Sequence, residues 1–413
     1  MFNGCPSAKS EVGQPQQAAS ARKVRRIFSD STLNFLSYPK QTMLSKDTLR
    51  LQYAVCKTNR PPTMTRGPKT WTAAKPGRAK AKTSKTQAIK VDQVAEDEIS
   101  IPKELQQKCL DIFKRALWTG PEDIAALQEV KGHLYNRDFL KAFGSEHYLR
   151  AYALRWSAAR ALGYLHVFGG IEEHLLDRGD DLLKVLAVGG GAGAELVALA
   201  GRLNRSGSDN AAGDQQTSIK LDLVDIAAWQ QVAESLANAC NTPVELSKYA
   251  SAAAREANVP FVPAGRLHTQ SEQANVLDWD GQMVVSKTGP MDLVTIMFTL
   301  NELYSTSVPK TQRFLSYLTA AMHHGALLLI VDSPGSYSTV AINGAEKKYP
   351  MQWLLDHTLL GPKADEARPM KWEKLVEHES KWFRLPDGLR YPIELENMRY
   401  QMHLYRRTSL AAG

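Results

Sequence analysis

The sequence predicts an α/β fold: a mostly parallel, Rossmann-like sheet of seven strands that follows a helical extension and a disordered basic leader. Short apolar runs alternate with helix-like stretches after residue 182, amphipathic segments precede them, and the first 95 residues show no sustained apolar period. Short strands that alternate with helices are typical of a parallel sheet with βαβ crossovers. We expect a leader over residues 1–95, a helical extension over 96–175 and the sheet domain over 176–413.

Seven runs have the composition of strands. Five apolar runs are each followed by Gly or Asp and then a helix-like stretch, and they cover residues 184–188, 221–224, 259–262, 293–298 and 326–331. Two more runs, 382–385 and 398–406, lie close together and predict an antiparallel pair at the sheet edge. Before the sheet, Pro102 and Pro121 each stand where a helix begins, and residues 134–165 predict two or three further helices.

Composition excludes several classes of protein. A chain of 413 residues predicts one large domain with extensions. No run approaches 18 apolar residues, so we expect no transmembrane helix. The four cysteines are scattered without a CxxC pair, which favours a reducing compartment and predicts neither a disulfide framework nor a zinc site.

The charge is distributed unevenly. Residues 1–90 hold 18 Lys and Arg against 3 acidic residues, and the rest holds 33 against 40. A basic arm attracts polyanions, and the stretch from Lys69 to Lys90 has the composition of a nuclear or nucleolar signal or an RNA-contacting arm. A solvated tail is the alternative, and the acid-poor first 25 residues leave a mitochondrial presequence open. Met64 is an alternative start.

A glycine-rich turn follows the first strand. In a strand–turn–helix, such glycines adopt positive φ and let a ligand approach the backbone, although purely structural turns share the pattern. Asp225 ends the second strand, where an acid accepts hydrogen bonds from ribose hydroxyls or caps a loop. Asp278, after the third run, is a candidate for the adenine amine or a turn former. The glycines are Gly189, Gly190, Gly191 and Gly193.

The charge beside the turn distinguishes two cofactors. The glycines fit G-x-G-x-G and not the dinucleotide pattern G-x-G-x-x-G. Glu195 near the helix start would repel a pyrophosphate, whereas the sulfonium and amino groups of S-adenosylmethionine (SAM) are cationic. We therefore expect SAM as the cofactor. Val188 stands where many methyltransferases have an acid, so Glu195 or a loop carbonyl is left to hold the SAM amino group.

The fourth strand emerges into polar and aromatic residues at the edge where doubly wound folds bind ligands. Asn301 can orient a heterocycle through its amide, Glu302 can act as a base, and Tyr304 can stack or form a hydrogen bond. The alternative is that the Asn-Glu pair caps the following helix.

Several segments together resemble one family. Residues 135–164 and the stretches LAVGGGAGAEL, VDIAAW, TLNELY, VDSPGSYS and KKYPMQWLLD are similar to the fungal 25S ribosomal RNA uracil-N3-methyltransferases, over about 130–405. The segment R-W-S-x-A-R-A is not a generic methyltransferase motif. The resemblance implies a Rossmann-like class I methyltransferase that methylates uridine N3 in the nucleolus. We also expect a monomer without a metal ion. Its partner would be ribosomal RNA or a pre-ribosomal particle.

The resemblance also implies roles for single residues. It places Gly189, Gly191 and Gly193 in the SAM turn, Asp225 at the ribose and Asp278 near adenine. Because uridine N3 carries a proton, attack needs a base, for which Glu302 is the candidate, with Asn301 and Tyr304 holding the uracil. A target base in a helix must be flipped out. Candidate phosphate contacts are Arg155, Arg160, Lys347 and Lys348, of which the two arginines are equally compatible with a structural role.

Two other readings stay open at this stage. The first is a SAM methyltransferase that acts on a protein or a small molecule. The second is a non-catalytic Rossmann-like ribosome-assembly factor, which the absence of an acid before Gly189 leaves open.

Overall fold

A computed structural model describes residues 100–176, 181–208, 218–335, 337–342, 345–361 and 371–408. For residues 206–208, 337–342 and 345–348 it describes the backbone alone. The predicted leader, the polar insertion after residue 208 and Met64 lie outside the described residues.

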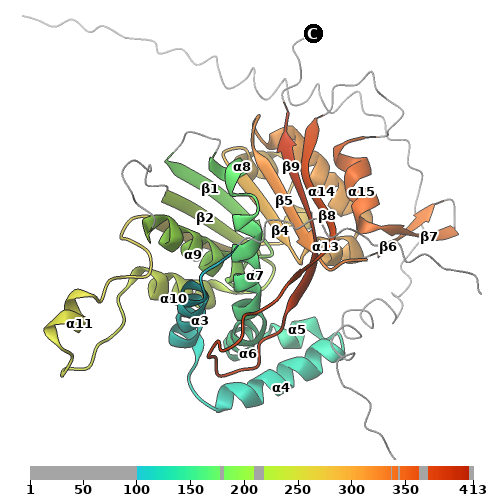
Figure 1. Cartoon of the computed structure of the whole chain (residues 1–413). Coiled ribbons are helices and arrows are strands. Elements are labelled where there is room, and N and C mark those ends of the chain that lie inside the picture. The colour runs from blue at the N-terminus through green and yellow to red at the C-terminus, as the bar shows by residue number, and fades with distance from the viewer. Residues whose placement is uncertain are drawn as a thin grey trace, which may run out of the picture. The chain divides into compact units, whose positions relative to one another are not determined.

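The main sheet has seven strands in the order β3-β2-β1-β4-β5-β9-β8 (Figure 1). Strands β1 to β5 are parallel, β9 runs antiparallel to β5, and β8 runs antiparallel to β9. The predicted fold class and the antiparallel edge pair are thereby confirmed. The strands are β1 (Leu182–Val188), β2 (Ser218–Asp225), β3 (Leu267–Gln273), β4 (Leu293–Met297), β5 (Leu327–Asp332), β8 (Trp372–Phe383) and β9 (Met398–Arg407).

Two of the predicted strands are wrong in position. Residues 259–262 form no strand; Phe261 and Val262 are buried in a loop, where the Val262 N–H bonds to the Cys240 carbonyl. The third strand is β3, with the sequence LHTQSEQ, which sequence reasoning missed because an edge strand keeps polar side chains exposed. Strand β8 begins at Trp372, ten residues before the predicted start. Its first part was missed because it carries many charged side chains.

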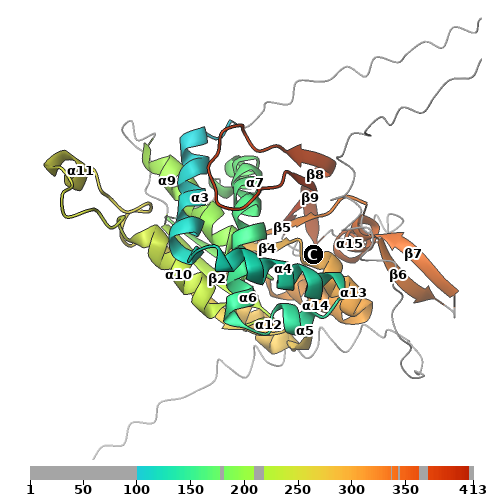
Figure 2. The same cartoon turned by 90° about the horizontal axis from the view of Figure 1, so that it is seen from below.

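A separate two-stranded hairpin, which the sequence did not predict, pairs β6 (Tyr337–Ile342) with β7 (Ala345–Pro350). It follows the carboxyl end of β5 and contacts α13 (Leu300–Thr306). In Figures 1 and 2 it projects on the side opposite α11 (Ala252–Glu256).

Before the sheet, the chain forms a series of helices. The predicted starts at Pro102 and Pro121 are confirmed, because each proline immediately precedes a helix. The series is α3 (Lys103–Leu117), α4 (Glu122–Tyr135), α5 (Phe139–Ala142), α6 (Glu146–Tyr152), the π-helix η1 (Ala153–Ser157), α7 (Ala158–Gly169) and α8 (Glu172–Leu176). The π-helix coincides with the R-W-S part of the family-specific segment, and π turns occur frequently at functional sites.

Each face of the main sheet is buried by its own helices. One face packs on α3, α7, α9 (Ala194–Ser208) and α10 (Gln230–Asn241). The other packs on α13 together with α12 (Gly281–Thr288), α14 (Val308–Ala321) and α15 (Met351–Leu359). Since α3 and α7 share one core with the sheet, the structure marks no separate core for the helical extension, and the limit at 176 stays a prediction.

None of the described helices is long and apolar enough to cross a membrane. In the same part of the chain, no group of three His, Cys, Asp or Glu side chains is placed to hold a metal ion.

Candidate active site

The turn between β1 and α9 requires glycine at two positions. Gly189 and Gly193 have φ of +77° and +81°, a region that other residues rarely adopt. A methyl group on Gly189 would overlap the side chain of Thr299, and one on Gly193 would overlap Leu236. The turn therefore brings the first strand's backbone against the end of β4.

The two middle glycines allow close packing behind the turn. A methyl group on Gly191 would overlap the Trp229 ring, and one on Gly190 would lie 2.7 Å from the Ala187 side chain. The Gly191 N–H donates to Asp225 Oδ2 at 3.2 Å. Of the four predicted glycines, Gly189 lines the adjacent cavity.

That cavity has a volume of about 260 Å³ and lies beyond the carboxyl ends of β1, β2 and β4. This is where doubly wound folds bind ligands. Its walls come from the strand ends, the segments after β2 and β3, the glycine turn with the start of α9, and helix α13. The helical extension adds Phe143, Tyr152, Ser157, Arg160 and Tyr164.

Glu195 is a buried acid without a full set of partners. Its side chain is 3% exposed, lines the cavity, and has one carboxylate oxygen, Oε1, with no hydrogen-bond partner. Burial raises the pKa of this carboxyl to about 7, an effect that a backbone hydrogen bond and Arg160 reduce. A buried acceptor in this state fits a cationic donor, and the amino group of SAM has that chemistry.

Asp225 lies at the cavity where β2 ends. Its carboxylate accepts the N–H groups of Gly191 and Ala227, and burial raises its pKa. Since each carboxylate oxygen has two acceptor positions, capacity remains for hydroxyl donors. The structure therefore brings two of the predicted cofactor acids, Glu195 and Asp225, to one cavity.

Asp278 is not among the residues that line the cavity. Its carboxylate is exposed and binds Lys310 Nζ at 2.8 Å and Asn275 Nδ2 at 2.9 Å, and these partners lower its pKa. Asp278 forms a surface ion pair, and its neighbours Val276 and Leu277 line the cavity; its contact with adenine stays a prediction.

Glu302 faces the cavity, and Tyr304 does not. Tyr304 is buried in the core between the sheet and α14, so its predicted contact with a substrate ring is corrected. Residues two apart on a helix point about 200° apart, so Glu302 and Tyr304 cannot share a face. Desolvation raises the pKa of Glu302, and the charge of Arg137 lowers it in part.

Asn301 has a structural contact. Its backbone N–H donates to Asp332 Oδ2 at 3.0 Å, its side chain is absent from the cavity lining, and α13 begins one residue earlier. Asp332 also accepts the Ser333 N–H at 2.7 Å, and burial raises its pKa to about 6. The helix-cap alternative gains no support, because Thr299 stands at the cap position of α13 without a side-chain cap hydrogen bond and the buried Asn301 Oδ1 has no hydrogen-bond partner among the described residues.

The four residues predicted to contact phosphate have different surroundings in the structure. Arg155 is buried and paired with Glu396, so it has a structural role in the helical extension. Arg160 lines the cavity and donates to the Tyr152 hydroxyl at 3.3 Å. The side chains of Lys347 and Lys348 lie outside the described residues.

Phe298, which sequence reasoning missed, is held in an unusual backbone conformation. Its φ is +56°, and its N–H donates to the Val331 carbonyl at 2.7 Å. The ring lies 4.9 Å from the Arg160 guanidinium and 6.3 Å from the Tyr164 ring. A large residue at positive φ stores strain, and such strain concentrates at functional sites.

Three aromatic rings form one wall of the cavity. Phe143 and Tyr152 from the helical extension lie 5.3 Å apart, and each lies within 6 Å of Trp229, at 5.9 and 5.6 Å. No sequence period marked these rings; the family-like segments 135–164 and VDIAAW contain them.

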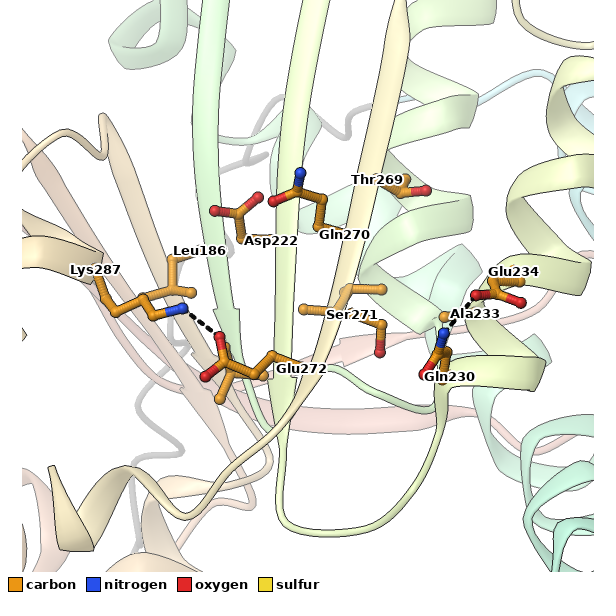
Figure 3. A pocket seen from close by; sticks show the side chains of 12 residues that line it. Leu186, Asp222, Gln230, Ala233, Glu234, Thr269, Gln270, Ser271, Glu272 and Lys287 are labelled. Atoms are coloured by element: carbon orange, nitrogen blue, oxygen red, sulfur yellow. Dashed lines mark hydrogen bonds and ion pairs between the residues drawn. The ribbon is translucent and has the colours of Figure 1, made fainter. Parts of the chain in front are cut away.

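A second, larger cavity of about 420 Å³ is lined by residues of β2 and β3 together with residues of α10, Leu186 and Lys287 (Figure 3). Its lining includes the ion pair between Lys287 and Glu272 and the hydrogen bond from Gln230 to Glu234. It lacks the glycine turn and the aromatic wall. The smaller cavity therefore holds the candidate active site.

Comparison with known proteins agrees with this geometry. Residues 116–406 match a family model described as "Putative SAM-dependent methyltransferase". The chain is 36% identical over 326 residues to the 25S rRNA (uridine(2843)-N(3))-methyltransferase of Saccharomyces cerevisiae, a match that covers 72% of this chain and 85% of the yeast enzyme.

Solved structures are similar at a lower level. A SAM-dependent methyltransferase from Methanosarcina mazei has 12% identity and a TM-score of 0.32, covering 58% of this chain and 97% of that one. An O-methyltransferase family protein from Burkholderia thailandensis has 13% identity and a TM-score of 0.33, covering 70% and 71%. The family assignment rests on the family model and the yeast relative. The chain belongs to the SAM-dependent methyltransferase family, and SAM is its cofactor.

Proposed function

We propose that this enzyme transfers the methyl group of SAM to N3 of a uridine in large-subunit ribosomal RNA. The observation that supports this most is the 36% identity, over 72% of the chain, to a yeast enzyme with that printed activity. The cavity agrees with this activity, because two acids suited to bind SAM line it: Glu195 beside the glycine turn and Asp225 at the end of β2.

The cofactor is held by the end of the cavity nearest the glycine turn. Glu195 accepts a hydrogen bond from the amino group, Asp225 accepts from the ribose hydroxyls, and Val276 and Leu277 flank the adenine. The fold requires glycine at position 189, because φ is positive there and a side chain would strike Thr299. When bound, SAM supplies an electrophilic methyl group.

Glu302 is the proposed general base. It removes the proton from uridine N3, so that the nitrogen lone pair is free to attack and the proton passes to the carboxylate. Desolvation raises its pKa, which makes the carboxylate a stronger base near neutral pH. A positioned base of this kind contributes about 10²–10⁴-fold to the rate.

The remaining wall positions the uracil. Phe298, Arg160 and Tyr152 face the same cavity as Glu302, and aromatic or guanidinium planes are surfaces on which bases stack. In a base pair the N3 atom of uridine lies within the pair, so the uridine must be unpaired or flipped out before N3 can reach the cavity. We place this reaction in the nucleolus, during ribosome assembly, with a monomer acting without a metal ion.

Mapping N3-methyluridine in large-subunit ribosomal RNA tests the function. Cells that lack the gene should lose the modification at one uridine, and a plasmid copy of the gene should restore it. An unchanged map would contradict the proposal. Calorimetry with purified protein separates the alternatives: a non-catalytic assembly factor without affinity for SAM gives no heat, whereas a protein or small-molecule methyltransferase binds SAM and leaves the RNA map unchanged.

A further inference from the structure

Trp382 is an exposed aromatic residue surrounded by cations. Its side chain is 47% exposed, near the end of β8. The guanidinium groups of Arg384 and Arg399 lie 5.1 and 5.7 Å from the ring, and Arg399 is its cross-strand partner on β9. The Arg399 Nε also donates to Ser380 Oγ at 3.0 Å, which fixes the guanidinium. The chain thus holds a Trp ring and two positive charges together at its surface.

The direction of Trp382 follows from its neighbours. Phe383 lies 5.5 Å from the His166 ring on α7, and the side chain of Met398, the strand partner of Phe383, reaches Gly163 on the same helix. Successive side chains on a strand alternate between the two faces. Trp382 and Arg399 therefore point to the other face of the sheet, the face that α15 covers.

Helix α15 brings a second set of rings toward this position. Lys374 on β8 binds Asp356 at 2.8 Å, and Glu377 on β8 binds Gln352. The two contacts show that β8 and α15 run in opposite directions, so the Trp382 end of β8 lies toward the first residue of α15. The start of α15, and Tyr349 just before it, is the part of this element nearest to the Trp382 end of β8.

The rings on α15 form a stack. Tyr349 and Trp353 have centroids 4.8 Å apart with planes at 18°, and Trp353 and His357 have centroids 5.2 Å apart with planes at 26°. Trp353 and His357 lie one above the other because they are four residues apart on α15, and Tyr349 at the end of β7 continues the stack. Trp353 is 49% exposed. A contiguous exposed group of aromatic rings of this kind is typical of an interaction site.

The Trp382 group lies at the end of the sheet where the parallel strands have their carboxyl ends, which is also the end that carries the active site. Asp332, the last residue of β5, pairs with Gln401, so Arg399 and Trp382 lie beyond the carboxyl end of β5. The hairpin β6–β7 also leaves from that end and contacts α13, which carries Glu302. Figure 1 shows this hairpin, α13 and α15 on one side of the molecule.

We propose that these two groups form one RNA-binding surface, on which unpaired nucleotides beside the target uridine are held. We call it the rim surface, and it consists of Trp382, Arg384, Arg399, Tyr349, Trp353 and His357. Bases extend the stack on α15 and contact the Trp382 ring, while the two guanidinium groups neutralise phosphates. Single-stranded nucleic acids are bound by this combination of aromatic planes and cations. The inference rests on the proposed function, because it takes the substrate to be RNA.

Affinity measurements on four variants test the rim surface. The probe is a transcript of large-subunit rRNA that spans the nucleotide equivalent to uridine 2843 of the yeast relative's substrate. Trp382→Ala and Trp353→Ala should each weaken binding of this RNA about tenfold, since one base–aromatic stack contributes about that much. Affinity for SAM should not change, and KM should rise for RNA alone. Trp382→Phe and Trp353→Phe should retain most of the affinity.

Tyr249→Ala is the matched control. Tyr249 is 82% exposed, and its ring lies 4.9 Å from Lys248 Nζ, so it has the same chemistry. It lies between α10 and β3, at the opposite edge of the sheet from β8. Its replacement should leave RNA affinity unchanged.

Separate results distinguish the inference from the proposed function. If the unaltered enzyme methylates the transcript and the two Trp→Ala variants bind it equally well, the rim surface is wrong and the function stands. If Tyr249→Ala weakens binding as much as they do, the assignment to this edge is also wrong. If the unaltered enzyme neither binds nor methylates large-subunit RNA, both proposals fail.

Discussion

At the scale of single residues, Glu195 links SAM binding to pH. Burial raises the pKa of its carboxyl to about 7, so the SAM-free protein loses the charge near neutral pH. A cationic ligand binds the ionised form. We expect affinity for SAM to fall as pH drops from 8 to 6, by up to about tenfold per unit below 7. Calorimetry across this range measures it, and Glu195→Gln should bind weakly with a flat profile.

The Glu195 carboxyl also makes the stability of the SAM-free protein depend on pH, in the direction opposite to SAM affinity. Because the folded pKa lies above the ordinary value of 4.5, the folded chain binds the extra proton, and stability falls as pH rises from 4.5 to 7. Glu195→Gln should therefore raise the Tm of the SAM-free enzyme at pH 8. An unchanged Tm together with unchanged SAM affinity would show that the carboxylate is not desolvated.

Glu302 gives the second prediction at this scale. Replacing it with Gln keeps the shape of the side chain and removes the base. We expect kcat to fall about 10²–10⁴-fold while affinity for SAM and RNA remains. Single-turnover assays with methyl-labelled SAM measure this. Full activity with normal binding would exclude Glu302 as the base.

At the scale of elements, the glycine turn combines two separate costs. Gly189→Ala meets both a positive φ and an overlap with Thr299, whereas Gly265→Ala meets a positive φ of +76° with open space around it. We expect Gly265→Ala to cost about 1 kcal/mol and Gly189→Ala to cost more and to abolish SAM binding. Thermal unfolding and calorimetry of both variants test this. Equal losses would mean that the contact with Thr299 has no effect.

The seven residues of helix α13 divide between anchoring the helix in the core and lining the cavity. Asp332 fixes its first turn through the Asn301 N–H, and Leu300 and Tyr304 anchor it in the core. Glu302 is then left on the side of the cavity, with Leu303 and Thr306. The sequence stretch that carries the candidate base therefore also carries the residues that hold the base in place.

At the scale of the whole molecule, the helical extension is part of the active site. Its residues Tyr152 and Arg160 close the cavity, and the ion pair between Arg155 and Glu396 joins it to the loop before β9. Arg155→Leu should lower stability by about 1 kcal/mol, because the loop loses a charged hydrogen bond while Glu396, whose side chain is 46% exposed, stays solvated. RNA affinity at a temperature where the variant is folded should stay constant. A specific loss of RNA affinity would show that Arg155 contacts a phosphate of the RNA.

The sequence by itself determined the class of fold and the chemistry near the first strand. Four of the five apolar runs became parallel strands, because buried strands between helices need continuous apolar sequence. The glycine turn, Glu195 and Asp225 were also recognised from sequence, because their roles depend on the strand and turn that directly precede or contain them.

The tertiary structure decided what depends on direction and on distant partners. The edge strand β3 has no apolar period, Asp278 turns to Lys310, and Tyr304 turns into the core while Glu302 faces the cavity. The aromatic wall joins Tyr152 to Trp229 across 77 positions of the chain. Local sequence carries the propensity of an element, but the face that each side chain presents is set by what packs against that element, and packing is known only once the chain is folded.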